Sequence, residues 1–201
     1  MKKRTYHQNC YLAQAGDFLG ERWTLLIFRE LLIQPCRFKD LNTYLAGMGT
    51  NLLSQRLKEL ELCAMVEKLN PADKRSAYRL TAKGREVEGV VLELIRWGAG
   101  NLPLEKEGRH YHHWDLLAMK ALFSPGHCRA EYTIQFSCEP LTAWVAARQQ
   151  DGGFIFSFAL GEAESAELVL AMTITDFRQQ VLEGKFRDDP GLSAFIDCFN
   201  P

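Results

Sequence analysis

The segment from Gly47 to Leu62 combines an apolar stripe with a row of hydrogen-bonding side chains. At about 100° per residue the leucines fall on one face of a helix, and they are Leu52, Leu53, Leu57 and Leu60. The other face carries short neutral or basic groups, namely Asn51, Ser54, Gln55 and Lys58. Such groups near a helix N-terminus can hydrogen-bond to base edges in the major groove of DNA. We therefore expect these four residues and Thr50, the predicted N-cap, to contact DNA, with Arg56 on the flank. An ordinary amphipathic surface helix is the alternative.

Two short helices must hold this face in place. Residues 37–45 predict a first short helix, and a turn from Gly47 to Gly49 leads into the helix described above. Two short helices joined by a glycine-containing turn of about three or four residues form a helix-turn-helix. Arg37, at the start of the first helix, is a further candidate for DNA contact. Upstream, residues 10–19 predict another short helix. Residues 22–33 are apolar on nearly every side, which predicts a buried central helix.

After Cys63 the hydrophobic period changes from helical to alternating. Residues 65–69 and 77–81 read as two short strands around a polar loop that is rich in turn formers. A hairpin directly after the recognition helix would form a wing. Lys74 and Arg75 would then lie at its tip, where they could reach phosphates or the minor groove. A solvated hairpin tip is the alternative.

Basic residues are concentrated in the first half of the chain. Residues 1–104 hold 16 Lys and Arg against 11 Asp and Glu, a net charge of +5, whereas residues 105–201 hold 8 against 14, a net charge of −6. This asymmetry fits a basic module that meets a polyanion, joined to an acidic module that does not. The sequence has no apolar run of about 18 residues and no apolar segment behind its basic N-terminus. We therefore expect a soluble, cytoplasmic protein without membrane association.

Residues that could support other chemistry lack the required spacing. The six cysteines contain no C-x-x-C pair, which predicts reduced thiols. His110, His112 and His113 lie close together but lack the spaced fourth ligand of a structural zinc site, so we expect solvated histidines and no metal. Motifs of hydrolases, phosphate-binding loops and metalloproteases are absent. We expect neither an enzyme nor a cofactor.

The second half predicts an α+β domain after a linker at residues 102–108. A helix over residues 113–123 precedes expected strands at 131–138, 141–148, 153–160 and 167–175, and a helix over residues 177–183 follows. The strands alternate apolar and polar residues, and one face is heavily aromatic. We therefore predict three or four antiparallel strands with helices on one side.

Between the two halves, Thr81 is expected to cap a longer helix that ends near Trp97. Its apolar face consists of Val87, Val91, Leu94 and Ile95. A small winged-helix domain leaves this face little core to cover, so a partner subunit explains it better.

A series of motifs in the first half resembles the HxlR-type subgroup of winged helix-turn-helix transcription regulators. In chain order these are Cys10, Gly20 to Ile27 with Arg29-Glu30-Leu31, Arg37 to Leu41, Leu53 to Glu61, Tyr78 to Gly84, and Trp97-Gly98. The resemblance covers residues 10–98. It implies a homodimer built through the first and last helices that binds pseudo-palindromic promoter DNA. The chain has Cys63-Ala64 where the family usually has a glycine.

The same resemblance places Cys10 at the position of the cysteine with which some HxlR-type regulators sense electrophiles or oxidants. A reactive thiol must form a thiolate, and Arg4, His7 and the helix start could lower the pKa of Cys10. A buried structural cysteine is the alternative. Cys36, beside Arg37, is a weaker second candidate.

A second, shorter resemblance lies near the C-terminus. Leu170 to Phe177 with Leu182 to Lys185 looks like the sterol-carrier-type lipid-binding fold, in a copy truncated at Pro201. It implies a pocket between helices and sheet for a hydrophobic effector. A packed core or an added dimer surface is the alternative.

Together these patterns predict an α+β protein with three parts. Residues 1–101 form a winged helix-turn-helix domain for DNA binding and dimerisation, residues 102–108 a linker, and residues 109–201 a small α+β domain with an antiparallel sheet. The predicted function is sequence-specific regulation of transcription as a homodimer, modulated by a hydrophobic ligand or by thiol chemistry. The alternative is a lipid or small-ligand binding protein whose winged helix serves only dimerisation.

Overall fold

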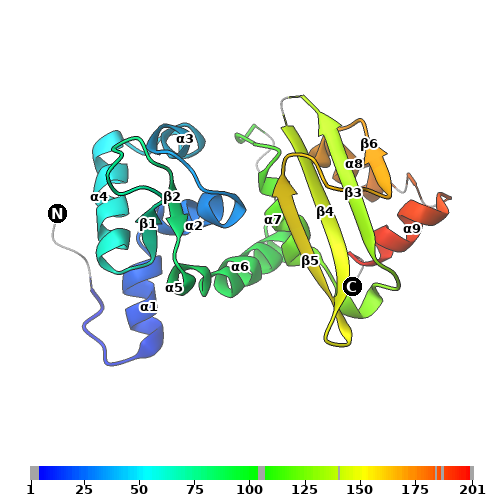
Figure 1. Ribbon diagram of the computed structural model, residues 1–201. Coiled ribbons are helices and arrows are strands. Elements are labelled where there is room, and N and C mark those ends of the chain that lie inside the picture. The colour runs from blue at the N-terminus through cyan, green and yellow to red at the C-terminus, as the bar shows by residue number, and fades with distance from the viewer. Residues whose placement is uncertain (1–4, 104–106, 140, 184, 187, 200–201) are drawn as a thin grey trace. The chain divides into compact units, whose positions relative to one another are not determined.

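The computed structural model describes residues 5–103, 107–139, 141–183, 185–186 and 188–199 (Figure 1). The chain forms two compact units, residues 1–91 and residues 92–201. Arg4 and part of the predicted linker, residues 104–106, lie outside the described residues. No helix among the described residues is long and apolar enough to cross a membrane.

The first unit is a bundle of short helices with a two-stranded hairpin (Figure 1). Its elements are α1 (Tyr11–Leu19), α2 (Thr24–Ile33), α3 (Phe38–Tyr44), α4 (Thr50–Leu62), β1 (Val66–Lys68), β2 (Tyr78–Leu80) and α5 (Ala82–Arg85). The helix α6 (Glu88–Asn101) begins in this unit and continues into the second. The mixed α+β fold expected from the sequence is confirmed.

Helix α2 is the centre of the first unit, as its apolar sequence predicted. Seven of its ten residues are buried, and Ile27 and Phe28 are fully buried. The helix begins at Thr24, two residues after the expected start, because Trp23 has a left-handed backbone with φ of 83°. The same tryptophan ring lies against Gly47 in the turn before α4. The start of α2 and the turn are therefore packed together.

The helix that Thr81 was expected to cap is two helices. The Thr81 hydroxyl accepts a hydrogen bond from Gly84 N at 3.0 Å, but the helix it caps, α5, has only four residues. Helix α6 then begins at Glu88. Gly84, inside the short first helix, allows a close approach, because a Cβ at this position would lie 2.0 Å from the Met65 carbonyl oxygen. The backbone of α5 is held directly against the start of the hairpin.

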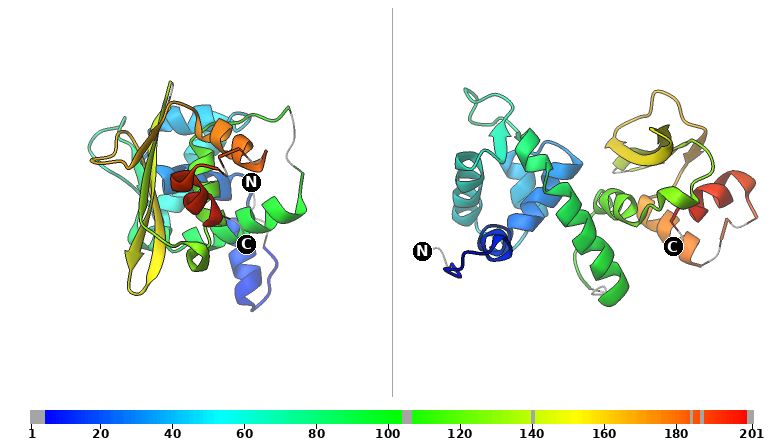
Figure 2. Two further views of the ribbon diagram at one scale, coloured as in Figure 1. Left: turned by 90° about the vertical axis from the view of Figure 1, so that its right-hand side faces the viewer. Right: turned by 90° about the horizontal axis from the view of Figure 1, so that it is seen from below.

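The second unit is a four-stranded sheet with three α-helices on one face (Figure 2). Its further elements are α7 (Trp114–Leu122), β3 (Tyr132–Cys138), β4 (Leu141–Gln150), β5 (Gly153–Leu160), β6 (Leu168–Leu170), α8 (Ile174–Leu182) and α9 (Pro190–Asp197). A short 3-10 turn, η1 (Pro125–His127), precedes β3. The strand order is β5-β4-β3-β6.

The aromatic face expected from alternation is the one that the helices cover. Ring contacts join Phe136 on β3 to Phe177 on α8, at 5.3 Å between centroids, and Phe123 after α7 to Phe156 on β5, at 5.4 Å. Ile134 and Phe136 are buried and pair with buried residues of β4. The face of β3 that carries its polar residues is only partly exposed to solvent, because Thr133 on that face is also buried.

The prediction of a wholly antiparallel sheet was wrong for its last strand. Strands β3, β4 and β5 are antiparallel, but β6 runs parallel to β3 and has only three residues. The expected strand over residues 167–175 ends early because Thr173 caps α8, its hydroxyl accepting from Asp176 N at 3.0 Å. Ile174, expected on the strand, is the buried first residue of α8. Helix α9 was not anticipated.

Candidate nucleic-acid interface

Helix α4 has one buried face and one exposed polar edge. Leu53, Leu57 and Leu60 are the buried residues of the helix, as the periodicity predicted. Thr50, Asn51, Gln55 and Lys58 are exposed, and Ser54 is half-buried. The stripe of leucines anchors the helix to the core and leaves the opposite edge in contact with solvent.

The start of α4 differs by one residue from the expected start. The N-cap is Gly49, with extended backbone, and Thr50 is the first helical residue. Gly47 has φ of 101°, a left-handed conformation that glycine adopts without strain. Met48, between the two glycines, is buried and fixes the turn to the core. Thr50 and Asn51 are thereby presented in the first turn of the helix.

The side chains of this polar edge differ in whether they already have an intramolecular partner. Gln55 Nε2 donates a hydrogen bond to Glu59 Oε1 at 2.9 Å, one turn along the helix. Lys58 is exposed and makes no side-chain hydrogen bond or ion pair among the described residues. Gln55 must therefore exchange an intramolecular partner for any base contact, whereas Lys58 is available directly.

Arg56 is placed differently from the expected flanking DNA contact. Its side chain is only 12 % exposed and forms ion pairs with Glu21, in the turn before α2, and with Glu59 Oε2 at 2.6 Å. Both carboxylates belong to the same chain as Arg56, so its charge is already paired without DNA. The pair with Glu21 spans 35 positions in sequence and holds α4 against the loop between α1 and α2. The guanidinium of Arg56 is thus engaged by two carboxylates of its own chain.

The hairpin after α4 has the expected antiparallel register, with Val66 opposite Leu80 and Lys68 opposite Tyr78. The strands are shorter than predicted, although Leu69 N still bonds to Ala77 O at 2.9 Å. Tyr78 also forms a bridge with Cys36, with two backbone hydrogen bonds of 3.0 and 2.8 Å. This third segment ties the base of the hairpin to the end of α2.

The loop at the hairpin tip is ordered by its own polar groups. Asn70 N donates to Ser76 Oγ at 2.8 Å, and Arg75 N donates to Asp73 Oδ1 at 2.8 Å. The side chains of Lys74 and Arg75 are exposed, and neither makes an ion pair among the described residues. Two adjacent cations therefore project from a loop whose backbone is fixed.

Two further arginines, Arg37 and Arg79, lie in the first unit near the hairpin and the start of α3. Arg37 is the exposed N-cap residue of α3, where its backbone N donates to Asp40 Oδ2 at 3.0 Å. Arg79, which the sequence analysis missed, pairs across the hairpin with Glu67 at 2.8 Å. Its position directly opposite Glu67 follows from the strand register. This pair joins the two strands of the hairpin, whereas Arg37 makes no ion pair among the described residues.

Comparison with known proteins extends over the first half of the chain. A model of the HxlR-like helix-turn-helix family matches residues 18–106. The HTH-type transcriptional regulator YvaP of Bacillus subtilis is 35% identical over 86 residues, which are 42% of this chain and 80% of that protein. The chain belongs to the HxlR-like helix-turn-helix family. It is therefore a DNA-binding transcriptional regulator, as the motifs in the first half predicted.

Other members of the HxlR-like family show the same extent of similarity. The regulator YodB of Bacillus subtilis is 34% identical over 88 residues, 43% of this chain and 79% of that protein. An HTH-type regulator of Mycobacterium tuberculosis (strain H37Rv) is 35% identical over 94 residues, and the match covers 59% of its length. A crystal structure of quinone-bound YodB has a TM-score of 0.41 and 33% identity over 45% of this chain and 98% of that one.

The cysteines of this HxlR-like chain differ in accessibility. Cys10 is exposed at the N-cap position of α1, so the alternative of a buried structural cysteine does not describe the chain. Cys36 is buried, and burial raises the pKa of its thiol to about 12, with the carboxylates of Glu30 and Asp40 adding to the effect. Its expected role as a second reactive candidate is wrong, because the thiol stays protonated.

Proposed function

We propose that this HxlR-type regulator binds pseudo-palindromic promoter DNA as a homodimer, with α4 of each protomer in the major groove. The observation that supports this most is the exposed polar edge of α4, backed by buried leucines. Thr50, Asn51, Ser54 and Gln55 supply hydroxyl and amide groups that suit base edges, and Lys58 supplies a cation. Half-sites about one helical turn apart would suit two such helices.

The flanks of the interface carry the phosphate contacts. Lys74 and Arg75 at the hairpin tip, with Arg37 at the start of α3, are exposed cations on one compact unit. Phosphate contacts fix orientation on the duplex and carry no sequence information directly. Arg56 was expected among the contacts, and we propose that it acts on DNA binding only through the placement of α4.

A homodimer is supported by apolar side chains that no core covers. Tyr11 and Leu12 on α1 are 92 % and 80 % exposed. On α6, Val90, Leu94 and Trp97 are also exposed, with exposed fractions between 46 % and 58 %. Of the apolar face that the sequence predicted for a partner, Leu94 is among them, but Val87 and Val91 are buried by their own chain, so that part of the expectation was wrong. Isolated exposed apolar residues are normal, but aromatic and leucine side chains repeated along two helices mark an interface. These are the first and last helices of the family domain.

Sequencing the fragments that the purified protein selects from genomic DNA tests this function. We expect enrichment of a short inverted repeat upstream of genes and retention that weakens as salt rises. The alternative, a ligand carrier whose winged helix serves only dimerisation, predicts no salt-sensitive retention. Recovery of random fragments alone would contradict sequence-specific regulation.

A variant of the α4 edge tests the base contact. Gln55→Ala is expected to reduce discrimination between the selected site and random DNA by about 1–3 kcal/mol, because a bidentate amide contact to a base is lost. Lys58→Ala serves as the comparison, since loss of a phosphate contact weakens both complexes alike. An equal loss of affinity for the selected site and for random DNA in Gln55→Ala would show that Gln55 does not read the base sequence.

The input signal has two candidate sites, and the first is the thiol of Cys10. It is exposed at the N-cap position of α1. YodB, which shares 34% identity over 88 residues, has been crystallised with a quinone bound. We propose that electrophiles or oxidants modify Cys10 and thereby alter DNA binding. A Cys10→Ser protein that still responds to diamide or a quinone would exclude this route.

The second candidate is a hydrophobic effector in the second unit. A cavity of about 640 Å³ there has mainly apolar walls, which include Ile95, Met119, Phe177, Val181 and Phe199. A volume of this size fits a small organic ligand. The resemblance of residues 170–185 to the sterol-carrier-type fold points to the same class of ligand. Binding of a fluorescent fatty acid that Val181→Trp abolishes would support this site, and equal binding by both proteins would exclude it.

A further inference from the structure

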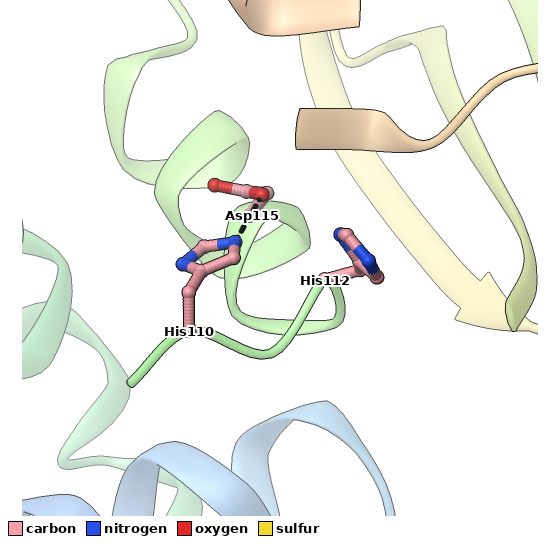
Figure 3. A group of neighbouring side chains, drawn as sticks. All are labelled: His110, His112 and Asp115. Carbon is pink, nitrogen blue, oxygen red and sulfur yellow. Dashed lines mark hydrogen bonds and ion pairs between the residues drawn. The ribbon is translucent and has the colours of Figure 1, made fainter. Parts of the chain in front are cut away.

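Two histidines and a buried aspartate converge at the start of α7 (Figure 3). The Nε2 atom of His110 is 2.9 Å from Oδ2 of Asp115. One potential ligand atom from each of His110, His112 and Asp115 lies within 4.8 Å of the other two. The side chain of Asp115 is only 3 % exposed, whereas that of His110 is 39 % exposed. The cluster is thus anchored from inside and open to solvent from one side.

A tight turn before α7 produces this cluster from residues close in sequence. Trp114 N bonds to Tyr111 O at 2.9 Å, and Asp115 N bonds to His112 O at 3.2 Å. The turn folds the loop that carries both histidines back over the first turn of the helix, where Asp115 lies. Residues two and five positions apart therefore bring their polar atoms together.

Helix α8 completes the cluster with Thr175. Its hydroxyl donates to Asp115 Oδ2 and lies 2.8 Å from His112 Nδ1 and 3.1 Å from His110 Nε2. The hydroxyl has a single proton, so both ring nitrogens must act as donors when no cation is bound. Arg178 Nε lies 3.7 Å from the other carboxylate oxygen, Oδ1. The hydrogen bonds from Thr175 and His110 hold Oδ2 of Asp115 on the side of the histidines.

We propose that this cluster is a binding site for one divalent transition-metal ion of the Zn²⁺ class. His110 Nε2, His112 Nδ1 and Asp115 Oδ2 are the ligand atoms, and the Thr175 hydroxyl or a water takes the fourth position. On binding, each imidazole carries its proton on the other ring nitrogen, which frees the lone pair of the ligand nitrogen. Imidazole and carboxylate are the donors that Zn²⁺ accepts in sites with three protein ligands. A ligating carboxylate is usually hydrogen-bonded by a neighbouring group, and here the Thr175 hydroxyl donates to Asp115 Oδ2.

The required adjustment is small. Ligand atoms around a tetrahedral zinc lie about 3.3 Å apart, as bond lengths of about 2.0–2.1 Å dictate. The pair His110 and Asp115, at 2.9 Å, must open by about 0.4 Å, and the widest pair, at no more than 4.8 Å, must close by at most about 1.5 Å. Rotation of the partly exposed histidine side chains supplies this movement, while the buried Asp115 stays fixed.

The site revises what the sequence suggested for the three histidines. His113 is buried and packs its ring against Tyr111 and Trp114, so it is neither solvated nor a member of the cluster. The missing third ligand is Asp115, which follows the second histidine by one helical turn. A metal ion here would join the start of α7 to α8.

Metal titration of the full chain tests the proposal. The background protein carries Cys10→Ser and Cys63→Ser, which removes the two exposed thiols that could bind metal instead. After treatment with a chelator, it is titrated with Zn²⁺ by calorimetry and with Co²⁺ by absorption spectroscopy. We expect one ion per chain and a Co²⁺ spectrum without a thiolate charge-transfer band.

Variants then assign the ligands. His110→Gln and Asp115→Asn should each weaken Zn²⁺ binding by about 100-fold or more, because each removes a direct ligand. His127→Gln, which changes an exposed histidine of the same unit outside the cluster, should bind as the background protein does. His110→Gln lies at a partly exposed position, so it decides the matter even if Asp115→Asn fails to fold. Absence of a bound ion in the folded background protein, or unchanged affinity in His110→Gln, would overturn the proposal.

Discussion

Removal of the two cations at the hairpin tip, in the double variant Lys74→Ala with Arg75→Ala, is expected to weaken binding to every DNA sequence and to flatten its salt dependence. Both side chains are exposed and project from a loop that is fixed by its own hydrogen bonds. Their replacement therefore leaves the loop backbone unchanged. The effect reports phosphate contacts, because such contacts release condensed counterions.

The expected magnitude follows from the number of contacts. Each phosphate contact contributes about 0.9 to the slope of log K against log salt concentration, so two contacts per protomer contribute about 1.8 and a homodimer loses about 3.6. Between about 50 and 200 mM salt, the advantage of the native protein over the variant should shrink by ~12-fold for one protomer and ~150-fold for a dimer. Discrimination between the selected site and random DNA should stay the same.

Fluorescence anisotropy of a labelled operator, titrated at four or five salt concentrations, measures both slopes. A matched control removes two cations from the second unit, with Arg129→Ala and Lys185→Ala, and should retain the native slope. An unchanged slope of log K against log salt concentration in the Lys74 and Arg75 variant would show that the hairpin tip does not contact DNA phosphates. An equal change in the control would show that the effect comes from net charge alone.

Three further predictions concern the stability of the first unit and the reactivity of its cysteines. Gly84→Ala should lower the free energy of unfolding by about 1–3 kcal/mol because its Cβ would meet a backbone oxygen, whereas Gly89→Ala, where the space is open, should raise it by up to about 1 kcal/mol in urea melts. Arg56→Ala should cost about 1–3 kcal/mol of stability as its largely buried ion pairs are lost; a lower salt slope of DNA binding at full stability would instead make it a phosphate contact. Alkylation of the native protein followed by mass spectrometry should label Cys10 but not Cys36, whose pKa of about 12 leaves only about 1% thiolate at pH 10. Labelling of Cys36 before unfolding would contradict its burial.

Elements with a strong hydrophobic period could be predicted from the sequence. The apolar helix α2, the leucine stripe of α4 and the strands β3 to β5 follow the expected patterns because each segment buries one face of regular period. The direction of β6 could not be predicted, because pairing with β3 depends on the path of the chain over the whole sheet. The close approach of Gly84 to Met65, 19 positions earlier, is equally invisible in local sequence.

Side chains that form the site were predictable where a helix face decides exposure, and unpredictable where a distant partner does. Asn51, Gln55 and Lys58 lie on the expected exposed edge. Arg56 has the same chemistry as a DNA contact, but Glu21, which is 35 positions away, engages it. The histidine cluster likewise gains Thr175, which lies 60 positions after Asp115 and meets it only in the folded protein.

The most direct test of the account is a dimethyl sulfate footprint on the selected operator. The reagent methylates guanine N7 in the major groove and adenine N3 in the minor groove, so it distinguishes the two surfaces of the duplex. With α4 in the major groove, the native protein should protect guanine N7 in two blocks about one helical turn apart. A fully bound operator whose guanine N7 atoms all remain reactive would contradict the placement of α4 in the major groove.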